Sequence, residues 1–84
     1  MNKDSRKYLS KYITITPEIE EKIKKHCKRY GIEEDICAWY KNKEDFYSDW
    51  SEIGYSKTEA NKVLHGGIGE FMVLTNGNIL RFVI

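Results

Sequence analysis

The sequence has few of the residues on which most enzymatic and metal sites depend. Of its 84 residues only two are histidine and two are cysteine, and no Gly-rich phosphate-binding loop is present. Neither His26 nor His65 lies beside a Ser or Cys in a nucleophile pattern. The four His and Cys positions also lack the spacing of a zinc site. The sequence therefore predicts no catalytic residues, no metal site and no cofactor, and favours a protein that is not an enzyme.

Long apolar runs and cysteine-rich segments are missing as well. Cys27 and Cys37 are too few for a disulfide scaffold, so we expect two small thiols in a reducing compartment. No run approaches the roughly 20 apolar residues of a membrane span, and the first residues lead into no apolar signal segment. A chain of 84 residues can bury only one modest core. We therefore expect a cytoplasmic protein without a membrane partner.

The net charge of +1 conceals an uneven distribution of charge along the chain. Residues 1–30 hold nine Lys and Arg against four Asp and Glu, whereas residues 31–54 hold two against seven. In the helix expected after Pro17, the Glu residues come first and the Lys and Arg residues last, as the helix dipole favours. Such asymmetry can mark distinct surfaces for partners.

The clearest fold signal is a hairpin at the C-terminal end of the sequence. Two apolar runs flank Asn76-Gly77, a dipeptide that suits a two-residue type I′ turn. This turn predicts a register in which Phe71 faces Phe82, and Leu74 faces Ile79. Because an isolated hairpin is barely stable in water, a third strand and covering helices are required.

The earlier residues are expected to supply these elements. Residues 1–10 are predicted as a basic flexible arm and residues 11–84 as a single domain. Alternation over residues 12–16 predicts the third strand, and Thr16-Pro17 begins a helix that ends at Gly31. The predicted class is α+β, with a small three-stranded antiparallel sheet (N-terminal strand plus C-terminal hairpin) packed with three to four helices.

Two further helical stretches are predicted in the middle of the chain. Residues 33–53 show helical spacing of apolar residues, and Asn42 can cap a second helix within that stretch. Ser56 and Glu59 match a capping box, which begins a short helix that Gly66-Gly67 stops.

Aromatic and acidic residues are interleaved between Trp39 and Tyr55. This segment holds six of the eleven aromatic residues, and a helix cannot turn all of its rings inward, so we expect one or two exposed rings beside carboxylates. The lead interpretation is a small non-enzymatic binding module, a regulator or inhibitor of the phage or mobile-element type. It occupies a protein partner or a second copy of itself, as a homodimer. The predicted contact residues are Tyr40, Asp45, Tyr47, Asp49 and Trp50.

Residues 54–66 resemble the turn and recognition helix of lac-repressor-family helix-turn-helix domains. Gly54 lies at the turn, Ser56 at the cap, and Val63-Leu64 at the inward positions. The resemblance implies DNA binding through a helix-turn-helix over residues 45–66, with the hairpin as a wing. Its contact residues would be Ser56, Lys57, Thr58, Asn61 and Lys62.

The order of strand, helices and antiparallel strands also resembles the RelE/ParE-type toxins. That resemblance implies an RNA-cleaving or partner-binding sheet. Here it would use Arg81 of the hairpin, with His65 as the nearest candidate acid or base.

Overall fold

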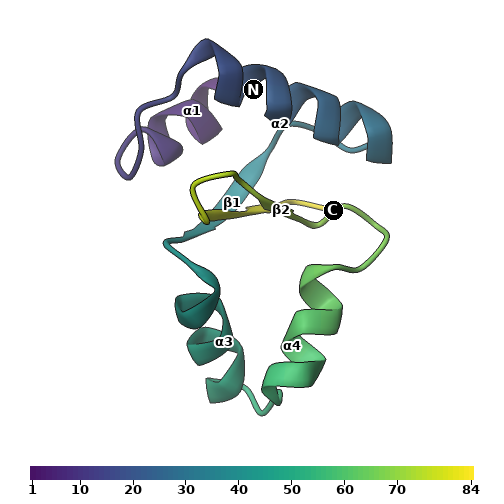
Figure 1. The fold of residues 1–84 in the computed structure, drawn as a ribbon. Helices are drawn as coiled ribbons and strands as arrows, with labels where there is room; N and C mark the ends of the chain where they lie inside the picture. The colour runs from purple at the N-terminus through teal and green to yellow at the C-terminus, as the bar shows by residue number, and fades with distance from the viewer.

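A three-stranded antiparallel sheet lies between two pairs of helices in the computed structural model, which describes residues 1–84 (Figure 1). Its elements in chain order are α1 (Lys3–Leu9), α2 (Pro17–Tyr30), β1 (Ile36–Tyr40), α3 (Lys43–Glu52), α4 (Lys57–Leu64), β2 (Phe71–Val73) and β3 (Ile79–Phe82). The strand order is β1-β3-β2, with α1 and α2 on one face and α3 and α4 on the other. The predicted α+β class, with three antiparallel strands and four helices, is confirmed.

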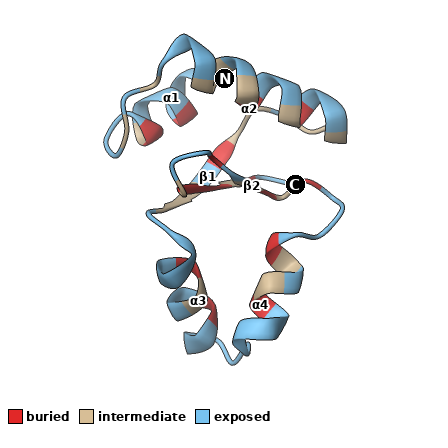
Figure 2. Ribbon diagram, viewed as in Figure 1, coloured by how far each residue is buried: buried red, intermediate tan, exposed pale blue.

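The central strand β3 serves two hydrophobic cores. Neighbouring residues of a strand point to opposite faces, so Ile79 and Leu80 enter different cores although both are fully buried. The first core joins the sheet to α1 and α2 through Leu9, Ile23, Cys27, Ile36, Leu74, Leu80 and Phe82. The second joins it to α3 and α4 through Phe46, Trp50, Ala60, Leu64, Phe71 and Ile79. In Figure 2 the buried positions of α3 and α4 lie on the sides that these two helices turn toward each other below the sheet.

Three of the helices begin at the caps that the sequence predicts. The Thr16 side chain accepts from the Ile19 amide at 3.2 Å, and Asn42 accepts from the Asp45 amide at 2.9 Å. At α4 the capping box is complete, because Ser56 accepts from the Glu59 amide and Glu59 accepts from the Ser56 amide. These local signals hold because each is satisfied by atoms within four residues of chain.

The third strand is not where the sequence predicts it. Residues 12–16 form the turn and loop that join α1 to α2, whereas the strand is β1, within a stretch predicted as helix. β1 pairs along β3, with Tyr40 opposite Ile79 and Ile36 opposite Phe82, and a bulge lies between Ile36 and Ala38. Ile13 and Ile15 still pack against the first core from the loop, which explains their apolar alternation without a strand.

Residues 1–10 are not a flexible arm but carry α1. Asn2 caps this helix by accepting from the Ser5 amide at 2.8 Å, and Leu9 is fully buried in the first core. The Ser5 hydroxyl accepts from the Ile36 amide at 2.7 Å, which ties α1 to the start of β1. The Asn2 cap and the burial of Leu9 stabilise a helix here, although most of the segment is polar.

The hairpin is present, but its register differs by one residue from the prediction. Phe71 faces Arg81 and Val73 faces Ile79. A type I′ turn needs positive φ at both central residues, yet only Gly77 has it, at 92°. The loop is instead a three-residue connection closed by Gly77 N donating to Leu74 O at 2.9 Å. This shift exchanges the faces of Ile79 and Leu80 relative to β2.

Candidate functional site

The outer surface of α3 carries a row of exposed carboxylates. Phe46 and Trp50 fix the inward side of this helix because both are buried in the second core. Residues 45, 49 and 52 follow the i, i+4, i+7 spacing of one helical side, and all three are exposed. The four ion pairs of the chain involve other residues. We call Asp45, Asp49 and Glu52 the α3 carboxylate strip.

Two members of this strip lie where negative charge is unfavourable for the helix. α3 has acidic residues in its first turn, as the dipole favours, but no basic residue in its last turn, where Glu52 is found. α2 shows the favourable layout, with Glu18 and Glu20 at its start and Lys28 and Arg29 at its end. The charges at the ends of α2 thus stabilise that helix, whereas the negative charges of Asp49 and Glu52 do not stabilise α3.

The Tyr40 side chain joins β1 to the strip. Its hydroxyl donates to the Asp49 carboxylate at 2.8 Å. Burial and this hydrogen bond raise the pKa of Tyr40 to about 12, and the protonated phenol holds the carboxylate in place. The structure therefore brings together Tyr40 and Asp49, two of the residues that the sequence predicts for protein binding.

Trp50 is predicted from the sequence on the contact surface, but it is only 8% exposed. Its ring packs at 5.0 Å from Tyr55 and 6.0 Å from Phe71, and the Arg81 guanidinium lies 5.7 Å from its centroid. Among the rings from 39 to 55, Tyr55 is the exposed one, at 39%. The sheet has a core on each face, so it accommodates more rings than a single core would.

Tyr47 connects α3 to α4 instead of facing a partner directly. Its hydroxyl donates to Asn61 Oδ1 at 2.9 Å, and the Lys57 ammonium lies 5.2 Å from its ring centroid. The two helices descend from the sheet side by side and meet at the turn before Ser56 (Figure 1). Ser56, Lys57 and Asn61 thus make contacts within the fold. The other two residues of the DNA-binding prediction, Thr58 and Lys62, are exposed.

Arg81 and His65 occupy different surroundings. Arg81 donates to the Glu70 carboxylate at 2.7 Å and covers the Phe71 ring at 5.4 Å. His65 follows α4 and borders a hollow whose lining does not include Arg81.

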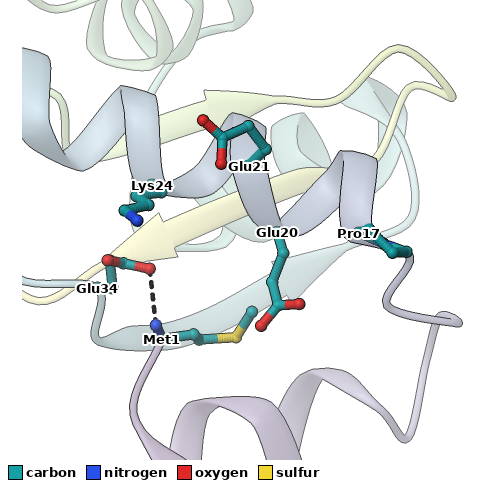
Figure 3. A pocket seen from close by; sticks show the side chains of 6 residues that line it. All are labelled: Met1, Pro17, Glu20, Glu21, Lys24 and Glu34. Carbon is teal, nitrogen blue, oxygen red and sulfur yellow. Dashed lines mark hydrogen bonds and ion pairs between the residues drawn. The ribbon is translucent and has the colours of Figure 1, made fainter.

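A hollow between α1, α2 and the start of β1 was not predicted from the sequence (Figure 3). Glu20, Glu21 and Lys24 of α2 line it together with Met1, Pro17 and Glu34. The Met1 amine donates to Glu34 at 2.7 Å, and Glu20 is paired with Arg6. The charges of Met1, Glu20 and Glu34 are thus engaged in ion pairs that fasten the start of the chain to its neighbours, whereas Glu21 and Lys24 belong to none.

No helix of the structure combines the length and apolar composition of a membrane span. Comparisons of the chain with protein-family models, curated proteins and solved structures find no match. The function is therefore inferred from the chain's own residues.

Proposed function

We propose that this chain is a non-enzymatic binding module that occupies a partner protein, and that the α3 carboxylate strip with Tyr40 makes the contact. The supporting observation is that Asp49 and Glu52 of the strip are exposed, belong to no ion pair and lie in the last turn of α3, where negative charge weakens the helix. Like charges at i and i+4, such as Asp45 and Asp49, cost a helix about 0.2–0.5 kcal/mol. Glu52 at the negative end of the dipole costs about 0.3–1 kcal/mol more.

The chemistry of the strip defines the partner surface as basic. Exposed carboxylates attract Lys and Arg side chains and speed the encounter with a positively charged patch. Arginine suits this surface best because its guanidinium can bind one carboxylate through two parallel hydrogen bonds. Asp49 is already oriented by Tyr40, so less side-chain freedom is lost when a partner binds. A regulator or inhibitor of the phage or mobile-element type would act in this way, by occupying a basic surface of its target.

Comparative capture from the native host tests this proposal. The wild-type chain, an Asp45→Lys/Glu52→Lys variant and a Glu21→Lys/Glu33→Lys control serve as baits. All four positions are exposed, and both variants change the net charge equally. We expect a protein that the wild-type and control baits retain and the strip variant loses. Identical proteins on all three baits would refute the assignment of the contact to α3.

DNA binding is the alternative, favoured by the capped helix α4 with Thr58 and Lys62 exposed on it. Phosphate contacts make such binding fall steeply with salt. A duplex shift lost in Lys57→Ala/Lys62→Ala would support this alternative. No shift at low salt would remove it.

A further inference from the structure

The β2 strand leaves one side of the sheet open. In the order β1-β3-β2, β2 lies at an edge. The Glu70 carbonyl accepts from the Phe82 amide at 2.7 Å, and the Leu74 amide donates to the Asn78 carbonyl at 2.8 Å. The backbone N–H and C=O groups of the even-numbered residues of β2 therefore point toward β3. By the alternation of an antiparallel ladder, the N–H and C=O groups of Phe71 and Val73 point away from β3. No hydrogen bond from the loops or caps reaches these groups.

A groove of about 370 Å³ runs along this open edge. Figure 1 shows α2 and α4 on opposite faces of the sheet, and residues of both helices line this groove. The residues that line it include His26, Tyr30, Leu64, His65, Met72 and Val73. We call it the β2 groove. A strand added to β2 would turn alternate side chains toward the α2 wall and the α4 wall.

The α2 wall of the groove is formed before any partner binds. His26 Nε2 lies 2.8 Å from Gly69 O, and because a carbonyl only accepts, Nε2 carries the hydrogen. The His26 ring also stacks on Phe82 at 5.2 Å and contacts Tyr30 at 4.9 Å. The Tyr30 ring packs so closely on Gly69 that a Cβ atom at position 69 would clash with this ring. A fixed wall lowers the entropy cost of binding.

The charge around the β2 groove favours an acidic occupant. Its lining contains no acidic residue. Next to the lining residue Tyr30, the Arg29 guanidinium lies 5.4 Å from the Tyr30 ring centroid and belongs to none of the ion pairs. A second copy of this chain fits less well. A two-fold axis that pairs β2 with β2 would set the α2 helices side by side, with the unpaired Arg29 side chains near each other.

We propose that the β2 groove binds an extended peptide segment with acidic side chains, which adds an antiparallel strand to β2. The N–H and C=O groups of Phe71 and Val73 bond to its backbone, and its carboxylates meet Arg29 on the α2 side. Addition of a strand to an exposed edge is a recurrent mode of peptide recognition. The site uses no residue of the α3 carboxylate strip, so it goes beyond the function proposed above and does not depend on it.

The test uses a capped six-residue peptide of alternating Glu and Val, with a Lys-for-Glu peptide as control, titrated into the ¹⁵N-labelled protein. We expect the amide resonances of Phe71 and Val73 to shift and their hydrogen exchange to slow. The Leu74 amide, already bonded across the hairpin, serves as the internal reference. Arg29→Glu should weaken binding about tenfold, whereas Lys7→Glu, exposed on α1, should not change it.

Val73→Pro removes one edge N–H without removing a bond to β3, as an edge strand tolerates. We expect this variant to keep the spectrum of a folded protein and to lose the peptide. If it unfolds, the comparison of Arg29→Glu with Lys7→Glu decides the question. The proposal is overturned by an unchanged spectrum at millimolar Glu-Val peptide, or by equal binding of the Lys peptide. It is also overturned if protection of Phe71 and Val73 rises with protein concentration alone, which would assign the edge to a second copy.

Discussion

Replacement of Glu52 by lysine should stabilise the fold. Glu52 is the last residue of α3, is exposed, and accepts no hydrogen bond from another residue. The last turn of a helix favours positive charge because its carbonyl ends are partly negative. The substitution therefore removes an unfavourable interaction and adds a favourable one at the same position. The introduced ammonium group would also lie three residues after Asp49, a spacing that allows an ion pair on the helix surface.

The size of the effect follows from these contributions. Each charge at a helix end is worth about 0.3–1 kcal/mol, and a surface pair at this spacing is worth about 0.2–0.5 kcal/mol. At the lower end of these ranges, the free energy of unfolding should rise by about 1 kcal/mol. For a domain of this size, that corresponds to a rise in Tm of about 4–8 °C. Glu52→Gln removes the negative charge only and should give less than half of the gain.

Thermal unfolding followed by circular dichroism measures these shifts, with urea unfolding as a second probe. Raising the salt concentration should reduce the difference between Glu52→Lys and the wild type, because exposed charges are screened. A Tm that is unchanged or lowered in Glu52→Lys would contradict the argument. The charges of α3 would then not weaken the helix, and the reason for a binding surface there would be lost.

Three further predictions concern the cores and the ionisable groups. Phe46→Ala should lower the free energy of unfolding by about 3–5 kcal/mol, measured in urea, because this fully buried ring packs against Phe71 at 5.2 Å. Burial and the bond to Asp49 raise the pKa of Tyr40 from 10.0 to about 12, so the folded chain keeps a proton that the unfolded chain releases. The contribution of Tyr40 to the free energy of unfolding should therefore be fully present below pH 10 and be lost as the pH rises toward 12. Tyr40→Phe should reduce this loss of stability. Burial raises the pKa of both thiols, that of Cys27 to about 11, but Cys27 is only 2% exposed whereas Cys37 is exposed, so a thiol reagent should label Cys37 in the folded protein and Cys27 only in denaturant.

The elements that could be predicted from the sequence are those fixed by local chemistry. Thr16, Asn42 and Ser56 cap their helices through atoms three residues away, and Gly31 ends α2 in the left-handed conformation. The position of the hairpin follows in the same way from Asn76-Gly77. Its register does not, because the type of turn depends on the φ of Asn76, which the dipeptide leaves open.

The location of the third strand depends on contacts distant in sequence. Residues 12–16 alternate as a strand does, yet β1 takes the place beside β3. The Ser5 hydroxyl, thirty-one residues earlier in the chain, accepts from the first amide of β1. Contacts between segments distant in sequence override the local propensity for helix or strand, and the residues around Ile36 contain no signal that predicts these contacts.

The candidate site could be predicted only in part for the same reason. Asp45 and Asp49 are identified from acidic residues among rings, and their exposure could be expected. The contact of Tyr40 with Asp49 could not, because the helical spacing assigns Tyr40 to a helix and it lies on a strand. The strand also sends Trp39 and Tyr40 to opposite faces, where Trp39 stacks on Tyr12 at 4.5 Å. Because the rings are divided between two cores, Trp50 can be buried. The sequence-based expectation of an exposed Trp50 assumed a single core.

Zero-length carbodiimide coupling can locate the contact surface, because it joins only carboxylates and amines that are in contact. The captured partner is coupled to the wild-type chain, and the linked peptides are identified by mass spectrometry. If the α3 carboxylate strip makes the contact, links should run from Asp45, Asp49 or Glu52 to lysines of the partner. Links that arise only from the lysines of α2 or from carboxylates outside α3 would contradict it.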